Sequence, residues 1–162
     1  MKARFALIAL VLAALIGGYL WHSRQPDQQA ARTVDRFIEA LEYQSSNLRS
    51  RDDVHEVIRE TVATKLKLQV TDPPSGFTLP EALSHESLCA KADQFHTFTS
   101  KREFKTVEES VEVIGDRAQV TRVEEITAAI LGNRGTETWQ LTFDLKRGED
   151  WKITGIRAKK SE

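Results

Sequence analysis

The chain has few of the residues that could cross-link a small domain. Its 162 residues include a single cysteine, Cys89, so no disulfide can form within the chain. We expect Cys89 to be a buried, inert thiol rather than half of an intermolecular disulfide. The sequence contains no block of basic residues, which makes nucleic acid an unexpected partner. The fold must therefore depend on an apolar core or on a partner.

Charge is absent from residues 5–21, an apolar run that begins at Phe5 and ends at Trp21. At 1.5 Å per helical residue the run is roughly 25 Å long, close to the ~30 Å hydrocarbon core of a bilayer. Lys2 and Arg4 precede the run, and basic residues favour the cytoplasmic side. The sequence thus predicts one inner-membrane span.

A cleaved signal peptide is the alternative, because it has the same basic start and apolar middle. Cleavage needs small residues after the apolar part, whereas Tyr19, Leu20 and Trp21 stand there. We therefore expect residues 1–24 to be an uncleaved signal-anchor helix. Residues 25–162 form one periplasmic domain under this prediction, with 20 basic and 24 acidic residues and a formal charge near −4.

Three segments of this domain are predicted to be helical. The first carries an apolar stripe at i, i+3, i+4 and i+7, formed by Val34, Phe37, Ile38 and Leu41. Ser50 and Asp53 resemble a capping box, which would start a second helix. A third, short helix is expected from Thr78 to about Ala90.

Strand periodicity dominates the remainder. Residues 66–70 alternate between apolar and polar, and period two returns from Phe95 onward. Gly115-Asp116 is a hairpin signal, and residues 132–135 are expected to form another turn. The alternation slips near Val123, where we expect a β-bulge.

Helices followed by an antiparallel meander predict the α+β class. The expected architecture packs the N-terminal helices on one face of a curved antiparallel sheet, preceded by one transmembrane helix. Each layer then covers the apolar side of the other. The core should join the first helix to the inward residues of the last strands, which are Trp139, Leu141, Phe143, Leu145, Trp151 and Ile153.

The C-terminal half resembles the nuclear transport factor 2-like superfamily, which also includes SnoaL-like cyclases, ketosteroid isomerases and limonene epoxide hydrolases. The resemblance rests on residues 113–120, on residues 139–145 and on a last strand of the form Trp-x-Ile-x-x-Ile. It implies a cone-shaped, cystatin-like α+β domain with a pocket at the wide end. The side chains that would line such a pocket here are Phe37, Phe95, Phe98, Trp139 and Phe143.

The resemblance gives little support for catalysis. Enzymes of the superfamily place tyrosines, histidines or carboxylates inside the cone, and isomerases pair a tyrosine with a buried aspartic acid. Tyr19 falls in the predicted anchor and Tyr43 at the end of the first helix, so this pair has no counterpart. We assign no catalytic or cofactor-binding residues and do not expect an enzyme.

Histidine and cysteine provide two weaker candidate sites. His85, Cys89, Asp93 and His96 have spacings that could hold zinc on a helix, but no zinc motif reinforces them. We expect partly exposed polar residues there and no metal or cofactor. His55 beside Glu56 could act as a base, but we expect instead a solvated histidine on the second helix.

Acidic residues gather on two neighbouring strands, at Glu108, Glu109, Glu112, Glu124 and Glu125. We expect a solvated outer face there, and an acidic patch for a partner is the alternative. The proposed partner surface comprises Glu109, Glu124 and Gln140. The outward side of the best-defined strand, around Gln140 and Thr142, could also form a homodimer through the sheet face.

These observations favour a single-pass, membrane-anchored periplasmic module that binds or scaffolds other envelope components without catalysis. The membrane contact would be made by residues 5–21, and the protein partner is an unidentified envelope protein. The alternative is a small-molecule-binding domain, or a SnoaL-like or isomerase-like enzyme, in a secreted or anchored form.

Overall fold

The computed structural model describes residues 25–42, 50–71, 80, 82–130 and 133–161. The helices are α2 (Pro26–Leu41), α3 (Arg51–Thr61) and α4 (His85–Phe98). The strands are β1 (Val62–Thr71), β2 (Ala82–Ser84), β3 (Thr99–Ile114), β4 (Arg117–Ile130), β5 (Asn133–Arg147) and β6 (Trp151–Lys160). None of these helices has the length and apolar content to span a membrane. The predicted span, residues 5–21, lies outside the described residues.

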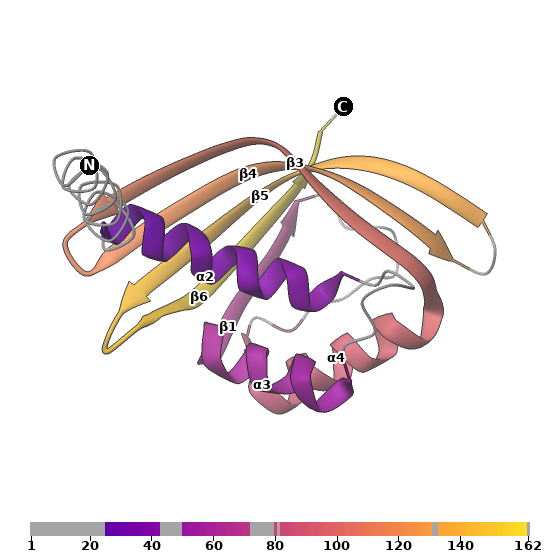
Figure 1. Ribbon diagram of the computed structural model, residues 1–162, viewed down its shortest axis with the longest axis horizontal. Helices are drawn as coiled ribbons and strands as arrows, with labels where there is room; N and C mark the ends of the chain where they lie inside the picture. The colour runs from indigo at the N-terminus through magenta and orange to yellow at the C-terminus, as the bar shows by residue number, and fades with distance from the viewer. Residues whose placement is uncertain (1–24, 43–49, 72–79, 81, 131–132, 162) are drawn as a thin grey trace, which may run out of the picture.

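The six strands form one curved sheet in the order β2-β1-β6-β5-β4-β3, and the three helices lie on one side of it (Figure 1). This confirms the predicted α+β class. The expectation of an antiparallel sheet is wrong at one position, because β1 runs parallel to β6. In the chain, β2 and α4 follow β1 before the antiparallel strands β3 to β6 begin. Strand β1 nevertheless pairs with β6, the last of these four strands, and not with β3, the first.

Helix α3 begins where the sequence predicts. The Ser50 hydroxyl accepts a hydrogen bond from the Asp53 N–H at 3.2 Å, and the Asp53 carboxylate accepts one from the Ser50 N–H at 3.1 Å. This reciprocal pair is a capping box, and it satisfies two backbone donors that have no partner inside the helix. Val54 and Ile58 then face the core.

The third helix differs from its prediction at both ends. Residues 82–84 form strand β2, in which Leu83 lies opposite Leu66 of β1, so α4 begins only after Ser84. The Ser84 hydroxyl caps it by accepting from the Ser87 N–H at 3.2 Å. The helix also continues past the predicted change of period at Phe95 and ends at Phe98. The later start of α4 follows from the pairing of residues 82–84 with β1, which the local periodicity of the sequence does not indicate.

The turns and bulges are partly as expected. Gly115 adopts φ 62° between β3 and β4, a conformation that glycine tolerates best. The irregularity predicted near Val123 lies opposite that residue, on β3, where the register shifts between Thr106 and Glu108. Residues 133–135 belong to strand β5 rather than to a turn.

The core joins α2 to the sheet as predicted, but Trp139, expected in this core, is half-buried and lies outside it. Phe37 and Phe143 meet edge to face with ring centroids 6.4 Å apart, and Trp151 and Ile153 are buried beside them. A register shift between Asp144 and Leu145, opposite Gly155, allows Ile156 to face inward as well. Each large side chain buried in this way stabilises the fold by about 1.5–3 kcal/mol.

Candidate functional site

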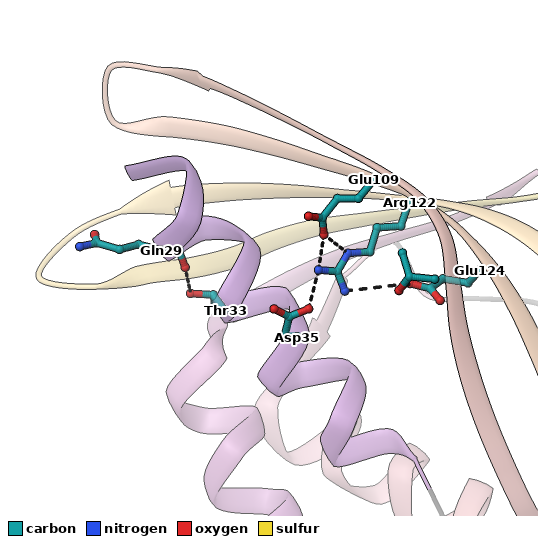
Figure 2. Close-up of polar contacts among 7 residues, drawn as sticks. Gln29, Thr33, Asp35, Glu109, Arg122 and Glu124 are labelled. Atoms are coloured by element: carbon teal, nitrogen blue, oxygen red, sulfur yellow. Dashed lines mark hydrogen bonds and ion pairs between the residues drawn. The ribbon is translucent and has the colours of Figure 1, made fainter. Parts of the chain in front are cut away.

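A group of charged side chains lies between helix α2 and strands β3 and β4 (Figure 2). At its centre Arg122 is 4% exposed. Its Nη2 lies 2.5 Å from Asp35 Oδ1, and its Nε donates to Glu109 Oε2 at 2.6 Å. Its Nη1 is 4.0 Å from Glu124 Oε1. We call Arg122, Asp35, Glu109 and Glu124 the Arg122 cluster; it contains one cation and three carboxyl groups.

The sheet register brings these residues together. Val120, Arg122 and Glu124 alternate along β4, so all three point to the side that the helices cover. The bulge on β3 then sets Thr106 opposite Glu124 and Glu109 opposite Arg122, with two residues of β3, 107 and 108, against Val123 of β4. Without the extra residue, the strand would not present both Thr106 and Glu109 to the helices.

The environment of Glu124 favours its neutral form. Burial raises the pKa of the Glu124 carboxyl, the hydrogen bond from Thr106 and the charge of Arg122 oppose that rise, and Glu109 and Asp35 reinforce it. The Thr106 hydroxyl donates to Oε1 at 2.8 Å, while Oε2 has no hydrogen-bond partner among the described residues. Glu124 is 0% exposed. The protonated, neutral form of Glu124 is therefore favoured more than it is in an exposed glutamate.

The pKa of Arg122 moves in the direction that keeps it charged. Burial alone would lower this pKa, but the hydrogen bonds and charges of Asp35 and Glu109 raise it. The guanidinium therefore stays positive and holds α2 to the sheet.

A second polar group lies further along the same face of the sheet. Arg102 is 0% exposed, its Nη2 contacts His96 Nδ1, and its guanidinium carbon lies 4.6 Å from the centre of the Phe95 ring. Burial and the charge of Arg102 lower the pKa of His96, so this imidazole accepts the contact in its neutral form. Glu42 at the end of α2 accepts from the Phe104 N–H at 3.2 Å.

Four of the five predicted pocket side chains are described, and they lie in different surroundings. Phe37 and Phe143 pack against each other in the core. Phe95 is 38% exposed and supports Arg102, and half-buried Trp139 donates from Nε1 to Glu137 at 3.2 Å. The side chain of Phe98 lies outside the described part of the structure. Three hollows on the described surface are lined by other residues.

The three predicted partner residues lie in different environments. The expectation of a solvated face is wrong for Glu124, because the β3 bulge and α2 enclose it. Glu109 binds Arg122 on the helix-covered side of the sheet. Gln140 is exposed and lies opposite Val123, on the other side. Val120, Arg122 and Glu124 stand at every second position of β4, so they share one side of the strand. This spacing from an apolar residue was the sequence signal that could have predicted inward-facing charges.

The histidine and cysteine candidates are also separated. His55 Nε2 lies 3.1 Å from Asp93 Oδ1, so the expectation of a solvated His55 is wrong. The carboxylate beside His55 is that of Asp93 on α4 and not that of Glu56. His85 Nε2 lies 2.9 Å from the Val62 carbonyl oxygen. Cys89 is buried, and burial raises the pKa of its thiol. Within the described ranges, no three metal-binding side chains converge.

Among the described residues, no helix lies on the opposite face of the sheet. In Figure 1 helices α2, α3 and α4 all lie on the other side of the long strands. Thr121 and Thr142 are opposite each other on this helix-free face, with Gln140 and Asp144 beside Thr142 on the same strand. Neighbouring side chains leave both threonines half-buried. The face is therefore polar around Thr142 and partly accessible.

Comparison with known proteins identifies the fold. No family model and no curated protein matches the sequence. Among solved structures, a dehydratase candidate from the NTF2-like family of Streptomyces avermitilis aligns with TM-score 0.63 and 19% identity, covering 84% of this chain and 96% of that one. An NTF2-like protein with a cystatin-like fold from Novosphingobium aromaticivorans aligns with TM-score 0.62 and 16% identity, over 93% and 88% of the two chains.

A ketosteroid isomerase-like protein from Erwinia carotovora atroseptica aligns similarly, with TM-score 0.61 and 13% identity over 86% of this chain and 98% of that one. Identities this low show a shared fold only, and they assign none of the activities of those proteins to this chain. The described domain therefore has the nuclear transport factor 2-like fold, with three helices packed on a six-stranded, mostly antiparallel sheet.

Proposed function

We propose that this chain is a single-pass, membrane-anchored periplasmic module that binds another envelope protein through the helix-free face of its sheet and catalyses no reaction. The observation that carries the proposal is the asymmetry of the domain. The three described helices all cover one side of the sheet, and no described helix covers the other side of the long strands β3, β4 and β5, of 14 to 16 residues each.

The chemistry of the helix-free face suits a protein partner. Threonine side chains combine a methyl group with a hydroxyl, so a face containing Thr121 and Thr142 can both pack and hydrogen-bond. Gln140 adds an amide that donates and accepts. Binding surfaces between soluble proteins are about as apolar as the rest of the surface, and such a mixed face meets that description.

The proposed anchor comes from the sequence. Residues 5–21 are uncharged and long enough to approach the bilayer thickness. The domain begins four residues later with Gln25 and Pro26, and proline is well tolerated at the first position of a helix. A short connection of this kind would hold the domain close to the membrane and limit the partners it can reach.

In-membrane crosslinking combined with one surface variant tests this function. Gln140→Arg with Thr142→Arg should abolish recovery of the crosslinked partner, because two long charged side chains would interrupt the face. Arg32→Glu with Arg51→Glu, on the exposed sides of α2 and α3, is the control and should leave recovery unchanged. The proposal fails if both variants retain the partner, or if crosslinked membranes yield no partner of the unmodified chain.

N-terminal sequencing tests the anchor separately. The protein recovered from membranes should begin at or near Met1 and should resist extraction by alkaline carbonate. A mature protein that begins near Gln25 would identify residues 1–24 as a cleaved signal peptide and would remove the anchor from the proposal.

A homodimer through the same face stays a prediction. Two copies could pair their threonine-containing strands, and light scattering of the detergent-solubilised protein measures the mass directly. A dimer that Thr142→Arg converts to a monomer would assign the face to self-association, and the partner search would then use the monomeric variant.

Glu124 supports a second candidate function, a small-molecule or isomerase-like site on the helix-covered side. Its fully buried Oε2 atom has no described hydrogen-bond partner, which is the kind of group that a bound polar ligand satisfies. Native mass spectrometry of the purified protein tests this function. A copurifying molecule that Glu124→Gln releases would support it, and a protein that carries nothing in either form would count against it.

A further inference from the structure

Two adjoining hollows lie on the helix-free face. The first, of about 600 Å³, is bordered by Arg117 and Lys146, and the second, of about 550 Å³, by Lys67 and Arg157. Asp144 and Thr154 belong to both hollows. The hollows therefore form one continuous depression across strands β4, β5, β6 and β1, which we call the basic groove after Arg117, Lys146, Lys67 and Arg157.

The floor of the basic groove is fixed by hydrogen bonds. The Asp144 carboxylate accepts from Gln119 Nε2 at 3.0 Å and from Arg157 Nη2 at 2.9 Å. Gly155 lies under this carboxylate, since a Cβ atom at Gly155 would come within 3.2 Å of Asp144 Oδ2. The missing side chain deepens the groove at its centre. The charges of Asp144 and Arg157 thus offset each other, and the positive character of the groove comes from its other cations.

The remaining cations of the groove are uncommitted. Lys67, Arg117 and Lys146 are exposed, and their side chains form no ion pair or hydrogen bond with any described residue. Glu112 is the one further acid bordering the two hollows. This excess of positive charge stands out because residues 25–162 as a whole are acidic, with a formal charge near −4. Charge complementarity therefore points to an anionic occupant of the groove.

The shape and lining of the groove favour a polypeptide. A bilayer surface is flat and would touch what protrudes from the sheet, whereas a depression across four strands admits an extended chain. Gln69 and Gln119 border the groove with amides that can pair with peptide N–H and C=O groups. Ile114, 69% exposed at one end, offers a contact for an apolar side chain.

We infer that the basic groove binds an extended, acidic segment of a partner protein. Lys67, Arg117 and Lys146 bind carboxylates of the segment, and the glutamine side chains bind its backbone. The inference rests on the proposed function, in which the helix-free face is the binding surface, and it adds the chemistry of the partner.

Fluorescence anisotropy with a labelled oligo-glutamate peptide tests the inference on the full-length protein in detergent. The peptide should bind, and its affinity should fall steeply as salt is added, because exposed charges are screened. The triple variant Lys67→Glu, Arg117→Glu and Lys146→Glu should weaken binding by about tenfold or more, since like charges then face each other. The matched control reverses Arg32, Arg51 and Arg59 on the helices, changes the net charge equally and should bind as the unmodified protein does.

Three results would overturn the inference: no binding of oligo-glutamate, equal weakening in the groove and control variants, or preferential binding of phosphatidylglycerol vesicles. Circular dichroism confirms folding, and Lys67→Gln, Arg117→Gln and Lys146→Gln replaces the reversal if the first variant unfolds. The outcome is separable from the proposed function. If the groove variant loses oligo-glutamate but still crosslinks to its membrane partner, the inference is wrong for that partner and the binding role of the face stands.

Discussion

Arg122 on strand β4 and Asp35 on helix α2 are 87 residues apart in the chain and lie 2.5 Å apart through Nη2 and Oδ1. This contact connects the first helix of the domain to the middle of the sheet. The same guanidinium also holds Glu109, so one buried cation fixes α2, β3 and β4 relative to one another. Its removal should affect the whole domain rather than one strand.

Replacing Arg122 with methionine should lower the free energy of unfolding by about 3–5 kcal/mol, because it leaves carboxylates without their buried cation. Urea denaturation measures the change. Arg36→Met is the matched control, since Arg36 pairs with Glu60 at an exposed position and should cost less than about 1 kcal/mol. Similar losses in the two variants would show that the Arg122 cluster contributes no more than a surface ion pair.

Glu124→Gln should change the pH dependence of stability. The pKa of Glu124 is raised in the folded protein above its ordinary value of 4.5, so the folded state binds the proton more tightly than the unfolded state does. The stabilisation from Glu124 is complete at pH values below 4.5 and is lost as the pH rises through the raised pKa. Glutamine, which stays neutral, should therefore be the more stable side chain at neutral pH.

Urea titrations of both proteins at a series of pH values check this expectation. The difference between them should shrink toward acid pH. A variant that is less stable than the unmodified protein at neutral pH would mean that ionised Glu124 contributes more to the Arg122 cluster than its burial costs.

Gly115→Val should destabilise the domain by about 1–2 kcal/mol. Gly115 has φ 62°, and a β-branched side chain is strained in that region of backbone space. Gly135→Val is the control, because Gly135 lies in strand β5 and a Cβ there meets no atom within 4 Å. Thermal melting measures both, and equal melting temperatures would contradict the need for glycine in the β3–β4 turn.

Phe37→Ala should cost about 3–5 kcal/mol, because it opens a cavity against Phe143 in the core. Phe95→Ala should cost less, since Phe95 is 38% exposed and its loss leaves less of a void. Chemical denaturation compares the two variants. A larger loss of unfolding free energy in Phe95→Ala than in Phe37→Ala would contradict this expectation. It would show that the contact between the Phe95 ring and Arg102 stabilises the domain more than the Phe37–Phe143 pair does.

Local patterns in the sequence were sufficient for several elements. The Ser50 and Asp53 side chains close a capping box within four residues, so the start of α3 needs no distant contact. Gly115 likewise marks its turn, because few other residues adopt its backbone conformation. The inward alternation of Phe143 and Leu145 follows from the period of a strand and identified the core face.

Other features depend on contacts between distant segments. Leu83 is part of a strand because Leu66, far back in the chain, offers it a partner, and β1 runs parallel to β6 because a long connection returns the chain to that edge. The position of the bulge also depends on the pairing of strands. The sequence showed that the period slips near Val123, but the pairing of β3 with β4 sets the extra residue on β3.

The amino-acid pattern was enough to define the class of the domain, its helix-covered core and its hairpin at Gly115, because these follow from side-chain period and backbone preference within a few residues. The Arg122 cluster and the basic groove arise from register. Glu124 is enclosed and Lys67 lies opposite Gly155, in the basic groove, because hydrogen-bonded strands align residues that are far apart in the chain, and a shift of one residue would turn each side chain to the opposite face.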